Sequence, residues 1–169
     1  MHHRLSPVAA CCESVNDIIG RAVSWLTVAV VVLMFTNVML RYLFNTGAPW
    51  QVELVLALHA VTFLTSMGYT LQAGEQVRVD VLYARFSPRR KAWVNLLGSL
   101  LLLLPLCGVL MWFSWAFVGS SWALQEASSE YNGLHGIFIV KAFLLIGPAL
   151  LIVQGLATII RAWQVIAHG

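Results

Sequence analysis

Charged residues are scarce in this sequence. Asp, Glu, Lys and Arg make up 10% of its 169 residues, against about 25% in ordinary soluble domains. So few charges cannot cover the surface of a soluble domain, and a hydrophobic content of 60% excludes a disordered chain. The mean hydropathy of +0.82 therefore indicates an integral membrane protein. The net charge of +3 requires no nucleic acid partner, because membrane proteins carry excess Lys and Arg on their cytoplasmic side.

The sequence has few cysteines, and recognisable catalytic motifs are lacking. Cys11, Cys12 and Cys107 form neither a Cys-x-x-Cys redox motif nor a metal-ligand spacing, so we interpret them as unpaired thiols. The sequence contains no phosphate-binding loop, nucleophile elbow, zinc motif or Gly-x-x-x-Gly pair. We therefore expect no enzyme activity, and no catalytic, substrate-binding, metal-binding or cofactor-binding residue in this chain.

What the sequence has in abundance is long apolar runs. Arg21 and Arg41 bracket the first, whose 19 uncharged residues would form a helix about 28 Å long, close to the bilayer's hydrocarbon thickness of about 30 Å. Three further runs give an all-α integral membrane protein with four transmembrane helices, filling one domain over residues 1–169. The expected spans are about 20–43, 50–74, 88–119 and 137–161.

Local signals refine these spans. Ser14 to Asp17 has the pattern of a capping box, which predicts that the first helix begins there. Ser87 and Pro88 are typical of a cap and a first helical position, and Pro105 is expected to bend the third span. The third uncharged run is 34 residues long, more than one span needs, so we end the helix near Gly119. A short periplasmic surface segment should follow it, to about residue 130.

The distribution of basic residues predicts the orientation. Of the ten Lys and Arg residues, eight fall in the N-terminal segment, the middle loop and the C-terminal segment, whereas Arg41 and Lys141 lie on the other side. The positive-inside rule then places both termini in the cytoplasm. In the middle loop, Val79, Leu82, Tyr83 and Phe86 have helical spacing and predict a short amphipathic cytoplasmic helix, with an extended loop as the alternative.

No Asp, Glu, Lys or Arg lies deep within an expected span, which argues against a self-contained ion-coupled transporter. His59 is the titratable side chain inside a span, and His135 lies just before the fourth. A hydrogen bond from His59 across helices is one interpretation. A haem held by His59 and His135 is the other, although their expected depths match poorly. Trp112 and Trp115 lie deeper in the third span, where we expect packing against another helix.

Two carboxylates on the periplasmic side, Glu126 and Glu130, are four residues apart and would share one helical face. That face is a solvated surface, a docking edge for a periplasmic partner, or the source of an ion pair with Lys141.

A set of short segments, taken together, has a recognisable pattern. They are Trp50 to Leu54, Gly74 to Asp80, Ser87 to Arg90, Ser121 to Glu130, and Lys141 with Gln154 and Gly155. These segments resemble the DctQ-type small membrane subunit of tripartite ATP-independent periplasmic (TRAP) transporters, and the resemblance covers roughly Arg41 to Arg161. In the family's His-x-x-Val-Asp element, Val79 and Asp80 match, but Gln76 stands where histidine is usual.

The resemblance implies a non-catalytic, multi-pass subunit of the bacterial inner membrane. Its expected partners are membrane lipids, a large multispan permease subunit that holds the substrate and sodium sites, and a periplasmic binding protein that delivers an organic acid. A sodium gradient would drive the complex without binding to this chain. Glu126 and Glu130 are candidate docking residues. The candidate family-motif or subunit-interface residues are Trp50, Glu53, His59, Arg78, Val79, Asp80 and Gln154.

Two other functions remain open at this point. The first is a haem-binding membrane anchor of a respiratory complex that uses His59 and His135. The second is a thiol-oxidising four-helix enzyme, which would need periplasmic cysteines, whereas Cys11 and Cys12 are expected on the cytoplasmic side.

Overall fold

A computed structural model describes residues 7–74, 83 and 86–168 of the chain. These residues are helical apart from the connections between helices, and four helical stretches are long and apolar enough to cross a membrane. The predicted all-α fold with four spans is therefore confirmed. The elements are α1 (Pro7–Leu43), α2 (Pro49–Ala73), α4 (Pro88–Gly98), the π-helical segment η1 (Ser99–Leu103), α5 (Leu104–Ala123) and α6 (Ile137–His168).

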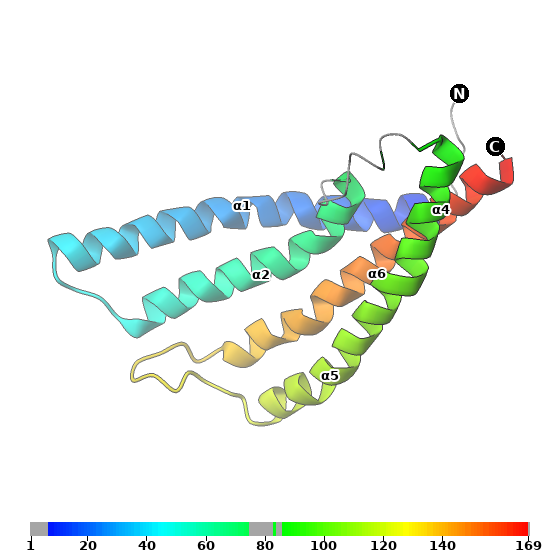
Figure 1. Cartoon of the computed structure of the whole chain (residues 1–169). Helices are drawn as coiled ribbons and strands as arrows, with labels where there is room; N and C mark the ends of the chain where they lie inside the picture. Colours follow the sequence, from blue (N-terminus) through cyan, green and yellow to red (C-terminus); the bar gives the residue numbers. More distant parts are fainter. Residues whose placement is uncertain (1–6, 75–82, 84–85, 169) are drawn as a thin grey trace.

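The four spans form an open layer of helices that lie side by side. The order across the layer is α1, α2, α6 and then the α4–α5 helix, with the helices spreading apart toward one end (Figure 1). Helix α6 is central, because it contacts α1, α2, α4 and α5. We refer to the end where α1 begins and α6 ends as the terminal end. The opposite end, with the α1–α2 and α5–α6 connections, is the hairpin end (Figure 1).

Much of the surface along the spans consists of exposed apolar side chains. Phe35 of α1 is 64% exposed and Phe113 of α5 is 74% exposed. Such a surface suits contact with lipid or with another membrane protein, and would not be tolerated in water.

Helix α1 begins about two turns before the predicted capping box, at Pro7. The capping-box prediction is wrong, because Ser14 lies inside the helix and its hydroxyl donates to the Ala10 carbonyl at 2.9 Å. The early turns are helical because one face of them packs against the rest of the layer. The buried residues on that face recur every three or four positions: Ala9, Glu13, Asn16, Gly20 and Val23.

The third span is one continuous helix from Pro88 to Ala123, a turn longer than predicted. Ser87 caps it as expected, since its hydroxyl accepts the Arg90 N–H at 3.5 Å. The π-helical segment lies immediately before Pro105, and the Leu104 N–H bonds to the Ser99 carbonyl. In a regular α-helix the ring of Pro105 would clash with the carbonyl of Leu101, four residues earlier. The wider π-helical turn lies at this position.

Close packing of α6 against α2 depends on a glycine. A Cβ atom added to Gly147 would lie 2.9 Å from the carbonyl oxygen of Leu64, a backbone atom that cannot move aside. Gly147 and the following Pro148 are buried at this crossing. The missing side chain therefore lets two helix backbones approach, as small residues commonly do in membranes.

We predict that Gly147→Ala destabilises the fold by about 1–3 kcal/mol through overpacking. Gly119→Ala is the matched control, because a Cβ there meets no heavy atom within 4 Å. The control should leave stability unchanged or slightly raised, since alanine favours helix. Unfolding of the purified protein by SDS in mixed micelles measures both, and equal stability of the two variants would contradict the close approach.

Candidate functional site

Buried polar side chains join α1 to α6 at the terminal end. The Asn16 Nδ2 donates to Gln154 Oε1 at 3.0 Å, although 138 residues separate the two positions. Asn16 is 1% exposed and Gln154 is 3% exposed, so neither amide can bond to bulk water. A hydrogen bond between two such amides fixes how α1 lies against α6.

An ion pair strengthens the same contact, one to two helical turns closer to the terminal end. Arg161 of α6 donates to the carboxylate of Glu13 of α1. Glu13 is 8% exposed, which makes this carboxylate far more enclosed than the usual surface pair. Three buried oxygens around this cluster find no hydrogen-bond partner among the described residues: Glu13 Oε1, Asn16 Oδ1 and Gln72 Oε1.

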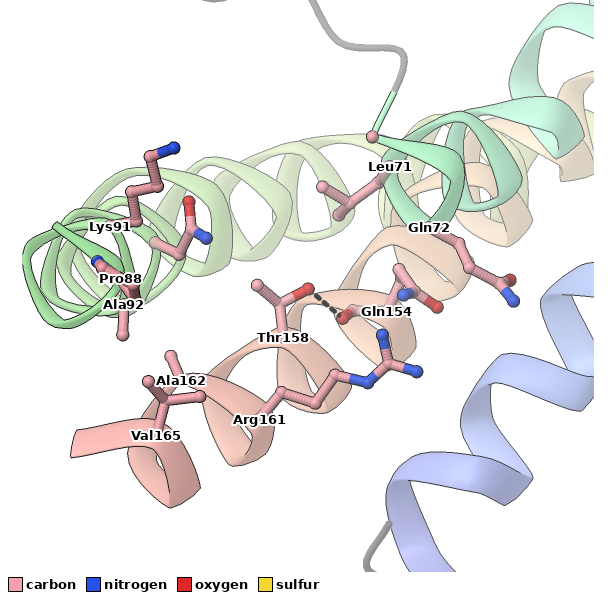
Figure 2. Close-up of a pocket in the computed structure, with 12 residues that line it drawn as sticks. Leu71, Gln72, Pro88, Lys91, Ala92, Gln154, Thr158, Arg161, Ala162 and Val165 are labelled. Carbon is pink, nitrogen blue, oxygen red and sulfur yellow. Dashed lines mark hydrogen bonds between the residues drawn. The ribbon is translucent and has the colours of Figure 1, made fainter. Parts of the chain in front are cut away.

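A polar cavity of about 390 Å³ opens beside this cluster, between the end of α2, the start of α4 and the last turns of α6. Figure 2 shows Lys91 of α4 and Arg161 of α6 on different sides of it. The Thr158 hydroxyl donates to the Gln154 carbonyl at 3.0 Å (Figure 2). Among the described residues, the lining contains amides, two cations and a hydroxyl but no His, Cys, Asp or Glu.

At the hairpin end, Glu53 in the first turns of α2 holds the α5–α6 connection. Its carboxylate accepts the hydroxyl of Ser128 and the backbone N–H of Leu134, the latter at 2.6 Å. Both bonds bridge elements more than 70 residues apart in sequence. Glu53 therefore holds the α5–α6 connection against α2, a helix that this connection does not join in sequence.

A second carboxylate ties the same connection to α6. Glu126 accepts from the Lys141 ammonium at 2.5 Å and from the Ser121 hydroxyl at 2.7 Å. Of the three alternatives that the sequence left open for Glu126, the structure shows the ion pair with Lys141. The ammonium also lies 4.3 Å from the centroid of the Phe117 ring, a cation–π contact. We refer to the bonds of Glu53 and Glu126 together as the hairpin-end clamp.

These bonds also set the charge state of Glu126. The hydrogen bond from Lys141, and then that from Ser121, lowers the pKa of Glu126 below its usual range. Because the folded-state pKa is the lower one, the pairing stabilises the loop above the ordinary glutamate pKa of about 4.3. That stabilisation is lost only as the pH falls through the folded-state value, so the clamp is intact at neutral pH.

The family model of the DctQ component of tripartite ATP-independent periplasmic transporters matches residues 30–165. The chain belongs to this family. No curated protein and no solved structure matches it. The chain is thus a TRAP transporter small membrane component and an inner-membrane protein.

The predicted site residues of this DctQ component are distributed over both ends and one span. Glu53 and Glu126 form the hairpin-end clamp, Gln154 lies in the terminal-end cluster, and Glu130 is exposed in the α5–α6 connection. Trp50 is 40% exposed near the start of α2. Arg78, Val79 and Asp80 fall outside the described residues, as does most of the predicted amphipathic helix.

His59 makes no hydrogen bond to any described residue and lies exposed on α2, so the predicted bond across helices within this chain is wrong. His135 is exposed in the α5–α6 connection. Within the described ranges, no group of three or more His, Cys, Asp or Glu residues could hold a metal ion. The family match favours the transporter interpretation over the haem anchor.

Trp112 and Trp115 also differ from expectation. They are 79% and 70% exposed on the outer face of α5 and do not pack against another described helix. Helix α6 packs against the opposite face of α5, so these two indoles point away from the other described helices.

Sequence reasoning missed Glu13, Asn16 and Ser128 as structural polar residues. Glu13 and Asn16 lie before the residues that the family model matches. The available signal was a pair of polar side chains three residues apart on one helical face, just ahead of an apolar run.

We predict that Asn16→Ala and Gln154→Met each destabilise the protein by about 1–2 kcal/mol, because each leaves the other amide buried without its partner. The double variant should lose less than the sum of the single losses. A double-mutant cycle in mixed micelles measures this coupling, and strictly additive losses would show that the two amides do not interact.

We predict that Lys141→Met loosens the α5–α6 connection while the helices remain folded. Glu126 then loses its strongest partner, so backbone amides in residues 124–136 should exchange with deuterium faster at pH 7. Glu130→Gln is the control, because that exposed carboxylate lies outside the clamp. If both variants exchange like the wild type, the ion pair does not hold the loop.

Proposed function

We propose that this chain is the non-catalytic small subunit that packs beside the large permease subunit of a TRAP-type secondary transporter. In this proposal the large subunit carries the substrate and cation sites, and a cation gradient drives the uptake. A periplasmic binding protein delivers the substrate, an organic acid. The match of the DctQ family model to residues 30–165 is the observation that carries the proposal.

The placement of charge supports a companion role. In the described spans the charged side chains that form ion pairs lie toward the two ends, at Glu13 with Arg161, at Asp17 with Arg21 and at Glu126 with Lys141. The sequence has no Asp, Glu, Lys or Arg in the apolar middle of any span. An ion-coupled carrier needs such groups along its path.

In the proposed orientation the hairpin end faces the periplasm and the terminal end faces the cytoplasm. The distribution of Lys and Arg in the sequence supports it. The α5–α6 connection would then lie where a periplasmic binding protein docks. Glu126 serves to shape this connection, whereas Glu130 and the 95% exposed Tyr131 are free to meet the partner.

Co-expression with a large permease subunit encoded beside this chain tests the proposal. We predict that an affinity tag on this chain recovers the large subunit, and that the two proteins elute together in size-exclusion chromatography. We also expect the chain produced alone to behave less well in detergent than the chain in the complex. Stable monodisperse behaviour alone, with no partner recovered on co-expression, would contradict the proposal.

A further inference from the structure

His59 lies near the middle of α2 on an exposed stripe of that helix. It comes ten residues after Pro49, the first residue of the helix, which is about 15 Å along the helix axis. Val52, Leu56 and Phe63 are exposed on the same helical face, at 43%, 61% and 58%. We refer to Val52, Leu56, His59 and Phe63 as the α2 stripe. A single imidazole thus interrupts an otherwise apolar surface deep in the membrane.

Lipid alone does not satisfy this side chain. An imidazole always carries at least one N–H donor, and hydrocarbon offers no acceptor. At this depth the short histidine side chain cannot reach the headgroup region, as a long lysine or arginine side chain can. His59 has no hydrogen-bond partner among the described residues either.

The other exposed faces of the described layer differ from this one in degree. The outer face of α5 presents Trp112, Phe113 and Trp115. Each indole carries one N–H on a large apolar ring, whereas the small imidazole ring has both a donor and an acceptor to satisfy. On α1, the exposed Thr36 donates its hydroxyl to the Val32 carbonyl at 2.8 Å. The threonines and serine near His59 on α2 bond in the same way to carbonyls of their own helix. Histidine cannot satisfy itself in this manner.

We infer that the α2 stripe is the face against which the large permease subunit packs, and that this subunit supplies a hydrogen-bonding group to His59 at mid-membrane depth. The inference rests on the proposed function, because it takes the large subunit as the occupant. Leu56 and Phe63, on either side of His59, would fill apolar depressions in the partner. The interhelical hydrogen bond at His59 would then fix the register between the two proteins.

Two measurements on the co-expressed pair test this inference. A photo-reactive phenylalanine analogue replaces Leu56 or Phe63, and at control positions it replaces Phe35 of α1 or Phe113 of α5. Cross-links to the large subunit should form from Leu56 and Phe63 and not from Phe35 or Phe113. All four side chains are at least 58% exposed in the isolated chain, so access to the probe is matched.

The second measurement is the affinity of the pair. His59→Leu should weaken association about three- to tenfold, the range expected for loss of one interhelical hydrogen bond. Thr36→Leu is the matched control and should leave association unchanged. The His59→Leu chain alone should resist SDS at least as well as the wild type, because an exposed imidazole has been replaced by an apolar side chain. That result separates a lost contact from a folding defect.

The outcomes distinguish the inference from the function on which it rests. If the wild-type chain recovers no large subunit, the proposed function fails. If the complex forms but cross-links arise only from Phe35 or Phe113, the inference is overturned and the function stands. The same holds if His59→Leu binds as tightly as the wild type, if Leu56 and Phe63 cross-link to no protein, or if they cross-link only to a second copy of this chain.

Discussion

Helices inside a bilayer gain little from hiding apolar side chains from one another, because lipid is equally apolar. The layer described here therefore depends on polar bonds at its two ends and on close backbone contact between them. The Asn16–Gln154 bond and the Glu13–Arg161 pair hold one end, and the hairpin-end clamp holds the other. Between them, Gly147 lets α6 approach the backbone of α2.

These constraints converge on α6. Lys141, Gly147, Gln154 and Arg161 are all residues of this helix, and through them it contacts α5, α2 and α1 in turn. An arrangement centred on one helix leaves both broad faces of the layer open. Lipid can cover such open apolar faces, and a subunit can also use them to pack against a larger membrane protein.

The number and approximate position of the spans could be predicted because membrane insertion depends on the local content of apolar residues. The ends of the helices depend on packing, which the local sequence does not show. Helix α1 is extended to Pro7 by the contacts of Glu13 and Asn16 with α6, although Ser14 to Asp17 has the pattern of a helix start. Ser14 bonds within the helix instead.

The site was predictable only in part. Glu126 and Lys141 are opposite charges expected on the same side of the membrane, so their pairing was one of the alternatives that the sequence offered. The Asn16–Gln154 bond joins residues 138 positions apart and requires knowledge of which helices are neighbours. The exposure of His59 was equally inaccessible, because α2 is apolar nearly all round and its pattern does not indicate a buried face.

The polar bonds lie at the two ends of the layer, and the middle of the spans is mainly apolar. This arrangement affects how such a subunit would act in the proposed complex. A scaffold must keep its shape while a neighbouring protein moves. Polar bonds at both ends resist splaying of the helices, and the middle has no Asp, Glu, Lys or Arg of the kind that marks an ion path. The open faces then become the means of attachment, and a polar group on such a face is tolerable only where a partner covers it. In the proposed complex, stability and partner recognition would thus come from different parts of the same layer. The polar bonds at the two ends would supply stability, and His59 on the face between them would contact the partner.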